Sequence, residues 1–194
     1  MSTTRDRFTL DALRWRPWLE TVDDVGVTPE QAALVAEVAP SPDSRPYYAV
    51  LAHDAPALRE RTALFNAIMY GPGGLRRADR ELATVAASRL NGCVYCASVH
   101  ARRYVQLTKD EAGMRRLLDD GLAAEQGERE RALIDFAAKL TDAPDQLGAA
   151  DLTPLRSLGL ADADILDAAL ATAMFAWANR LMLTLGEPEP SAET

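Results

Sequence analysis

The sequence has few of the residues on which disulfide frameworks and metal sites depend. Its 194 residues include only two cysteines and two histidines. Two cysteines cannot build the multi-disulfide framework of a small secreted domain. A structural zinc site normally takes four ligands, and this chain has no second cysteine pair. Any cysteine chemistry must therefore come from the single pair, Cys93 and Cys96.

Basic charge and long apolar runs are also scarce. The chain has 21 basic and 29 acidic residues, a net charge of -8, and no long Lys/Arg run of the kind that binds nucleic acid. Residues 168–179 form a charge-free stretch that is shorter than the roughly 18 apolar residues of a membrane span. Residues 1–20 mix charges with apolar residues, unlike a signal peptide. We expect a cytoplasmic protein with neither nucleic acid nor membrane as a partner.

Strand patterns are missing, whereas helix signals recur. Thr28, Pro29 and Gln31 form a helix start with an N-cap, a first-turn proline and a capping box, and Thr108 with Glu111 can form another box. Helical spacing of apolar residues marks two further segments: Leu133, Phe136, Ala137 and Leu140, then Leu166, Leu170, Met174, Trp177 and Leu181. The second segment is apolar enough on its other faces to be largely buried. The sequence predicts an all-α fold.

The chain divides into three parts by composition. Residues 1–44 are punctuated by prolines, and we interpret them as an N-terminal extension that packs on the core or on a neighbouring subunit. Residues 45–187 carry the helical patterns and form the predicted domain. Residues 188–194 are predicted to be a flexible tail.

The stretch NGCVYCASVH, residues 91–100, concentrates the reactive side chains. Asn91-Gly92 suits the end of one helix, so a second helix should begin at or just before Cys93. Cys93 and Cys96 then share one helical face, close enough for a disulfide after local adjustment. A helix N-terminus favours the thiolate, which is the reactive form of cysteine.

Two titratable residues can assist these thiols. His100 lies one turn beyond Cys96 on the same face, where it can accept a proton directly or through water. Glu81 falls at the edge of the inward stripe of the preceding helix, where partial burial can raise its pKa and suit it to acid–base work. Tyr95 can donate a hydrogen bond or simply pack.

Each of these residues also has a plainer interpretation. The cysteine pair could bind metal or pack inertly, His100 could be structural, and Glu81 could face water, as most helix carboxylates do. Redox chemistry is favoured because paired thiols at this spacing in a reducing cytosol are rarely accidental.

Taken together, Glu81, Cys93, Cys96 and His100 resemble the core motif of the alkylhydroperoxidase AhpD-like family, within the carboxymuconolactone decarboxylase superfamily. The segments RADRELATVAASRLNGCVYC and FAWANRLMLTLG are similar to its peroxidase-related branch, and the likeness covers roughly residues 46–186. The resemblance implies an AhpD-like multi-helix bundle, homo-oligomers based on dimers or trimers with active sites near subunit contacts, and thiol-dependent reduction of organic hydroperoxides without a cofactor or metal. Residues 1–44 lie outside it.

The resemblance also implies a role for each site residue. Cys96 would attack the hydroperoxide and become a sulfenic acid, Cys93 would resolve it as a disulfide, and Glu81 with His100 would form the proton relay. A dithiol reductant, unidentified by the sequence, would restore the thiols. The best-studied members carry a histidine where this chain has Tyr95, and a tyrosine with a pKa near 10 is a poorer proton carrier at neutral pH.

Two other functions remain open at this point. The chain could be a dithiol–disulfide oxidoreductase that acts on another protein or on a small electrophile. It could also be a helical oligomeric binding module in which the cysteine pair is structural or zinc-loaded.

Overall fold

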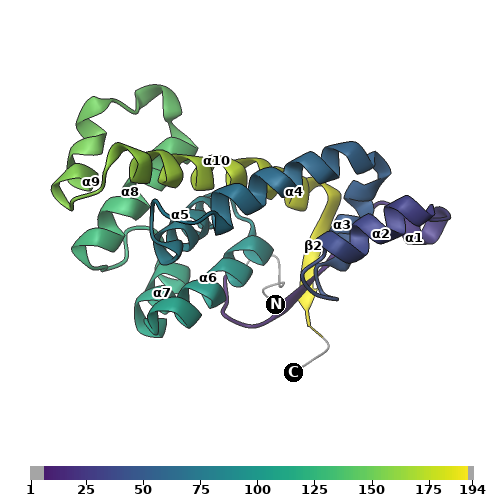
Figure 1. Ribbon diagram of the computed structural model, residues 1–194. Coiled ribbons are helices and arrows are strands. Elements are labelled where there is room, and N and C mark those ends of the chain that lie inside the picture. Colours follow the sequence, from purple (N-terminus) through teal and green to yellow (C-terminus); the bar gives the residue numbers. More distant parts are fainter. Residues whose placement is uncertain (1–6, 192–194) are drawn as a thin grey trace.

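Two helices, α5 (Arg77–Leu90) and α10 (Asp162–Leu185), pack against each other in the middle of the fold, and several of the other helices pack directly on one or both of them (Figure 1). The computed structural model describes residues 7–191. The remaining α-helices are α1 (Val22–Val25), α2 (Pro29–Val38), α3 (Arg45–Leu51), α4 (Ala55–Tyr70), α6 (Val94–Thr108), α7 (Glu111–Asp119), α8 (Glu128–Asp142) and α9 (Thr153–Ser157). Three short 3-10 helices cover Ala52–Asp54, Pro144–Gln146 and Ala149–Leu152. The all-α prediction is confirmed.

The helix starts follow local capping chemistry. Thr28 caps α2 by accepting a hydrogen bond from the Gln31 backbone N–H at 3.2 Å, as expected. The predicted box of Thr108 with Glu111 is wrong. Asp110 caps α7 instead, because the Thr108 hydroxyl donates to Tyr104 O at the end of the preceding helix.

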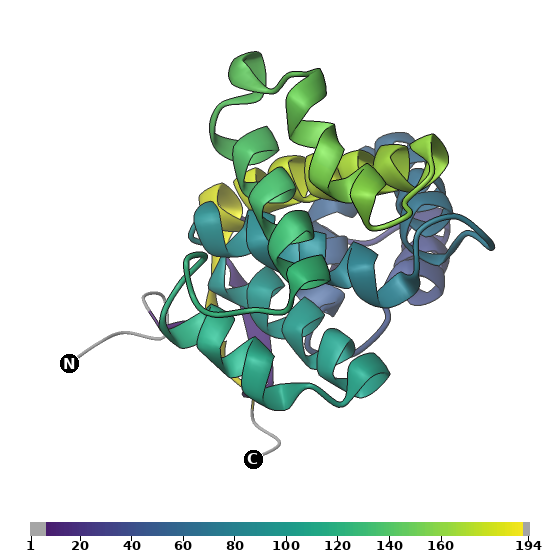
Figure 2. The same cartoon turned by 90° about the vertical axis from the view of Figure 1, so that its left-hand side faces the viewer.

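A small ribbon of two antiparallel strands, β1 (Leu13–Pro17) and β2 (Gly186–Pro190), joins the two ends of the described chain. Both views show the strands side by side beside α6 (Figures 1 and 2). Trp15 is 1% exposed and donates from Nε1 to Met182 O at 3.1 Å. A Cβ at Gly186 would lie 2.3 Å from the Trp15 ring, so only glycine fits there.

The ribbon corrects the predicted organisation at the C-terminal end. Residues 188–190 pair with β1, and Ser191 is buried, so this part of the expected flexible tail is ordered structure; residues 192–194 lie outside the described residues. The strand was missed because Gly186–Pro190 reads GEPEP, with none of the β-branched or aromatic residues that mark strands. The boundary at residue 44 stays a prediction.

The helix α10 buries only part of the expected stripe. Met174 is buried, whereas Leu166, Leu170 and Trp177 are 57%, 39% and 44% exposed. The inner face combines Phe175 with several alanines, and it packs on α5 and α8. By length and composition α10 could cross a membrane, but this packing identifies it as a core helix.

Candidate active site

The turn between α5 and α6 presents the cysteine pair at a helix N-terminus. Asn91 ends α5, and Gly92 adopts the left-handed conformation with φ 78°. Cys93 is the N-cap of α6, and its backbone N–H donates to Ser88 O at 2.9 Å. The predicted helix break at Asn91-Gly92 is therefore confirmed, and Cys96 lies one turn into α6.

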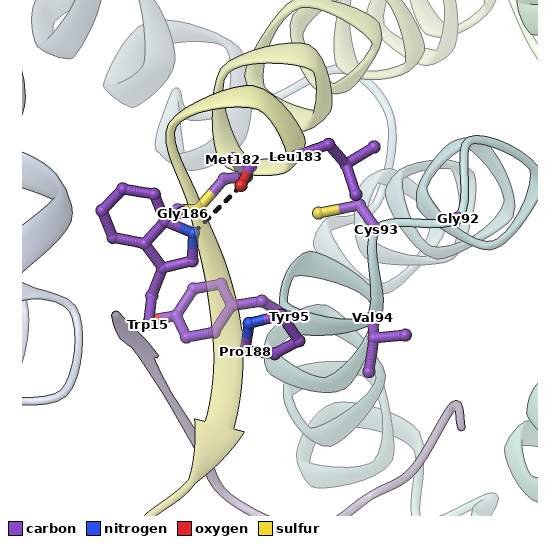
Figure 3. Close-up of a pocket in the computed structure, with 9 residues that line it drawn as sticks. All are labelled: Trp15, Gly92, Cys93, Val94, Tyr95, Met182, Leu183, Gly186 and Pro188. Atoms are coloured by element: carbon purple, nitrogen blue, oxygen red, sulfur yellow. Dashed lines mark hydrogen bonds between the residues drawn. The ribbon is translucent and has the colours of Figure 1, made fainter. Parts of the chain in front are cut away.

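Both cysteines are reduced and buried. Cys93 is 1% exposed and Cys96 is 4% exposed. Figure 3 shows the Cys93 sulfur facing a small pocket of about 20 Å³, next to Met182 and Leu183 of α10. Trp15 and Pro188 of the ribbon line the same pocket, so the ribbon covers this side of the dithiol.

Hydrogen bonds distribute charge unequally between the two sulfurs. The pKa of the Cys93 thiol lies below its usual value because the Cys96 thiol, the Cys96 backbone N–H and the Asn179 side chain all donate to a Cys93 thiolate, which outweighs burial. The pKa of Cys96 lies well above its usual value because it donates to Cys93 and is buried. The first negative charge on the pair therefore forms on Cys93.

Glu81 of α5 and His100 of α6 form a buried pair. His100 Nδ1 and Glu81 Oε2 are 2.5 Å apart, and Glu81 is fully buried. Arg77 binds the other carboxylate oxygen through Nε at 2.7 Å and also through Nη2. A raised pKa for Glu81 was expected. The structure corrects this. Burial raises the pKa of Glu81, but His100 and Arg77 together lower it by a larger amount, so Glu81 stays ionised.

This pairing fixes the orientation and tautomer of His100. A carboxylate can only accept, so Nδ1 carries the proton, and Nε2 of the neutral ring is left as an acceptor. The ring packs edge-on against Phe175 of α10 with centroids 4.3 Å apart. His100 and Glu81 also border a cavity of about 560 Å³, whose wall includes Arg102 and Arg103 of α6. The pair thus borders a space large enough for a small organic molecule, one helical turn beyond Cys96.

Tyr95 separates the cavity from the pocket at Cys93. It lines both spaces and is 6% exposed. Burial raises the pKa of its hydroxyl further above its usual value. Tyr95 therefore cannot replace a histidine as a proton carrier near neutral pH.

Two polar residues of the site, Asn179 and Arg77, were not predicted from the sequence. Asn179 of α10 is fully buried, accepts from Asn91 Nδ2 at 3.0 Å and donates to Ser88 Oγ at 3.1 Å, which fixes its amide beside the sulfurs. One signal could have identified it. Asn179 ends the charge-free stretch, and a buried asparagine there needs hydrogen-bond partners. Arg77 stands four residues before Glu81, a spacing that already predicts an ion pair.

The described residues bring together no further ligands for a metal at the cysteines. His53 hydrogen-bonds to Glu20 O at 2.9 Å and belongs to no ligand group. Within residues 7–191, no three His, Cys, Asp or Glu side chains are placed to hold one ion. A zinc ion at the cysteines would need further ligands from outside residues 7–191 or from another molecule.

Known proteins resemble this chain in sequence and fold. The sequence pattern of the carboxymuconolactone decarboxylase family matches residues 55–139, which include all four site residues. The alkylhydroperoxidase AhpD core structure of an uncharacterized peroxidase-related protein from Ralstonia eutropha JMP134 is 33% identical, with a TM-score of 0.68 over 76% of this chain and 77% of that one. The chain belongs to the AhpD-like group of the carboxymuconolactone decarboxylase superfamily.

Two further solved structures agree with this assignment. An uncharacterized peroxidase-related protein from Silicibacter sp. TM1040 is 34% identical, with a TM-score of 0.66 over 73% of this chain and 74% of that one. A protein of unknown function from Agrobacterium tumefaciens is 22% identical, with a TM-score of 0.57 over 69% of this chain and 90% of that one, and shares the fold. No curated protein matches the chain. The family resemblance noted in the sequence is therefore confirmed, and the chemistry is a separate question.

Proposed function

We propose that this AhpD-like protein is a thiol peroxidase that reduces organic hydroperoxides and serves in antioxidant defence. The observation that carries the proposal is the arrangement of a reduced dithiol at the start of α6, one turn from a histidine that a buried carboxylate orients beside a large cavity. A thiol, a base and a group that orients the base form the usual pattern of an activated nucleophile.

The proposed cycle has two steps, attack by one cysteine and resolution by the other. The Cys96 thiolate attacks the outer oxygen of ROOH, the O–O bond breaks, and Cys96 becomes a sulfenic acid while the alkoxide takes a proton to give ROH. Cys93 then attacks the Cys96 sulfur, a disulfide forms and water leaves. One hydroperoxide is reduced by two electrons for each dithiol oxidised.

The relay supplies and removes the protons of this cycle. His100 makes no direct hydrogen bond to either sulfur within residues 7–191, so we assign its proton exchange with Cys96 to a bridging water. Glu81 holds the ring in place and stabilises its protonated form. The positively charged ring can then donate to the departing alkoxide.

The assignment of attack to Cys96 comes from the family resemblance, whereas the hydrogen bonds favour the first thiolate on Cys93. Cys96→Ser and Cys93→Ser variants separate these roles. In the proposed cycle, Cys96→Ser consumes no hydroperoxide, and Cys93→Ser accumulates a sulfenate that a cyclic dione traps on Cys96. Rapid turnover by Cys96→Ser, with the trapped adduct on Cys93, would reverse the assignment.

The partners and location follow from the same proposal. An organic hydroperoxide is the substrate, an unidentified dithiol compound is the reductant, no cofactor is required, and the protein acts in the cytoplasm.

A homo-oligomer would bury the apolar groove of about 380 Å³ between α4 and α10, which Leu64, Leu170 and Trp177 help to line. Trp177→Glu should then lower the mass measured by light scattering; an unchanged mass would assign another surface to the contact.

Dithiol–disulfide exchange is the second candidate function. The lowered pKa of Cys93 at a helix N-terminus favours it, because such thiols attack disulfides readily. Rates with a small disulfide and with an alkyl hydroperoxide, measured on the same reduced protein, discriminate between the two. Faster reaction with the disulfide would replace the peroxidase proposal.

A further inference from the structure

The cavity beside the relay carries an excess of positive charge on its wall. It measures about 560 Å³, and among residues 7–191 three arginines and two carboxylates line it: Arg77, Arg102, Arg103, Glu81 and Asp43. Arg77 is neutralised by its ion pair with Glu81. Arg102 and Arg103 of α6 therefore outnumber the one remaining carboxylate, in a protein whose net charge is -8. The local charge is opposite to that of the whole chain.

The protein itself makes little use of the two arginines of α6. Arg102 is half-buried and makes no side-chain hydrogen bond or ion pair within residues 7–191. Arg103 is exposed and donates only to Gln106 Oε1, at 3.0 Å. Asp43 accepts from Ser191 Oγ at 3.0 Å and lies beyond ion-pair distance of both arginines. Most guanidinium N–H groups of this pair are thus free to bind an anion.

Arg103 shares a helical face with the reactive groups. Cys96, His100 and Arg103 stand at positions i, i+4 and i+7 of α6, so they follow one another over two turns. Seven residues span roughly 10 Å along a helix axis. Helical side chains lean toward the N-terminus of their helix, which brings a long guanidinium nearer to His100. An anionic group bound there would lie within the length of one small molecule from the relay.

The rest of the wall suits an organic body. Apolar surface in the same cavity comes from Leu13, Pro40, Pro42, Val99 and the exposed ring of Tyr70. The volume of the cavity falls within the range of about 300–1,000 Å³ that is usual for sites of small organic ligands. The cavity therefore combines unpaired arginines, apolar surface and the relay histidine.

We propose that the substrates of this protein are organic hydroperoxides that carry a carboxylate, which Arg102 and Arg103 bind while the hydroperoxide end reaches the relay at His100. The inference rests on the proposed function, because the cavity serves hydroperoxide reduction only if the dithiol is peroxidatic. The carboxylate is unchanged in the reaction, since only the O–O bond breaks. The planar guanidinium matches a carboxylate in shape and donor spacing. A chain of negative net charge repels anions at a distance, so a preference for the carboxylate requires positive charge in the cavity itself.

A pair of unreactive product analogues tests the anion site. Cumyl alcohol and its para-carboxylate derivative share one body and differ only in the charged group, and calorimetry measures the affinity of the reduced protein for each. The carboxylate should bind at least about tenfold more tightly than the neutral alcohol, because charge-assisted hydrogen bonds to arginine are strong. The combined change Arg102→Met and Arg103→Met should reduce this preference to about twofold or less.

The matched control removes the same amount of charge from another surface. Arg115 and Arg156 are exposed arginines that pair with carboxylates outside the cavity and do not line it. Arg115→Met combined with Arg156→Met should keep the preference for the carboxylate. Equal affinities for the two alcohols in the parent protein, a preference that survives the loss of both α6 arginines, or an equal loss in the control would overturn the proposal. If the change at Arg102 prevents folding, Arg103→Met alone replaces it, and an unchanged preference in that variant would count against the proposal in the same way.

The binding test involves no redox step, so it separates the anion site from the peroxidase. Selective binding of the carboxylate by a protein that consumes no hydroperoxide would uphold the anion site and reject the peroxidase. If the peroxidase proposal holds, the kcat/KM for para-carboxylated cumene hydroperoxide should exceed that for cumene hydroperoxide about tenfold, chiefly through a lower KM. The ratio of the two kcat/KM values should fall to about one in the Arg102→Met and Arg103→Met protein. Equal kcat/KM values in the parent protein would overturn the substrate assignment.

Discussion

Asp79 and Glu81 of α5 are two buried carboxylates of one helix that stand two residues apart. Asp79 is 2% exposed and Glu81 is fully buried. Asp79 binds Arg76 at 2.7 Å and Arg129 of α8 at 2.7 Å, whereas Glu81 binds Arg77 and His100. Two residues along a helix turn the side chain by about 200°, so Asp79 ties α5 to α8 and Glu81 ties α5 to α6.

The kind of partner decides what each carboxylate can do. Arginine stays protonated at any pH that the protein meets, so Asp79 lies between two permanent charges and acts as a clamp. An imidazole can accept a proton at one nitrogen and donate from the other, so the Glu81 pair suits the proton relay that we propose. The Glu81 pair also borders the large cavity, whose lining does not include Asp79. Asp79 is therefore expected to matter for stability, and Glu81 for the proposed reaction.

The largest effect on stability is expected for Asp79→Asn. The change leaves two partly exposed arginines facing a neutral amide, and removing the buried acceptor of these charge-assisted hydrogen bonds should cost about 1–3 kcal/mol. Urea unfolding followed by circular dichroism measures this loss. Asp135→Asn, which removes the carboxylate of an exposed pair with Arg131, is the matched control and should cost less than about 1 kcal/mol. Equal losses would show that Asp79 is not a clamp.

Glu81→Gln should affect the reaction more than the fold. Glutamine has one acceptor oxygen in place of the two that Arg77 and His100 use, and it no longer stabilises a protonated ring, so the rate of hydroperoxide reduction should fall about 100-fold. The change leaves one arginine facing a neutral amide, whereas Asp79→Asn leaves two, so the loss of unfolding free energy should be smaller than for Asp79→Asn. Stopped-flow kinetics and urea unfolding of both variants test this contrast. A normal rate in Glu81→Gln would remove Glu81 from the relay.

Acid should weaken the fold through both carboxylates. The pKa of Asp79 is lowered because hydrogen bonds and charge from Arg76 and Arg129 outweigh burial, and the pKa of Glu81 is lowered likewise. The folded protein therefore binds fewer protons than the unfolded chain. This stability is complete above the unfolded pKa of about 4 and is lost as the pH falls through the folded values. Asp79→Asn should accordingly show a shallower loss of unfolding free energy below about pH 4; a slope equal to that of the parent would contradict this.

The smallest effect should distinguish the two arginines that hold Asp79. The Arg76 side chain is 61% exposed and that of Arg129 is 27% exposed. Water and salt screen the Arg76 contact more, so Arg76→Met should cost less than about 1 kcal/mol and Arg129→Met should cost more. Urea unfolding at low and high salt measures the difference. The reverse order would mean that the contact with α8 contributes little.

The site could be predicted in large part from the sequence because its main contacts are local. Cys93, Cys96 and His100 lie within two turns of one helix, and the break at Asn91-Gly92 places Glu81 on the helix before it. Asn179 comes from α10, and only the packing of that helix on α5 brings it to the sulfurs. The lowered pKa of Glu81 likewise depends on Arg77 and His100 together, which a view of the carboxylate alone did not include.

The fold shows the same division between local and long-range information. Helix starts at Thr28 and Cys93 follow from short capping signals. The inner face of α10 follows only in part, because the apolar spacing includes Met174, which is buried, but also Leu166, Leu170 and Trp177, which are exposed. The ribbon joins residues at opposite ends of the described chain, and no local pattern records that pairing.

The proposed function requires that a hydroperoxide oxidise Cys93 and Cys96 together, as one dithiol. The most direct test mixes fully reduced protein, without oxygen, with one equivalent of an alkyl hydroperoxide and follows intact mass and free thiols. We expect rapid loss of the mass of two hydrogen atoms, with both thiols consumed and one alcohol formed for each protein chain. Survival of both thiols at full hydroperoxide concentration would contradict it.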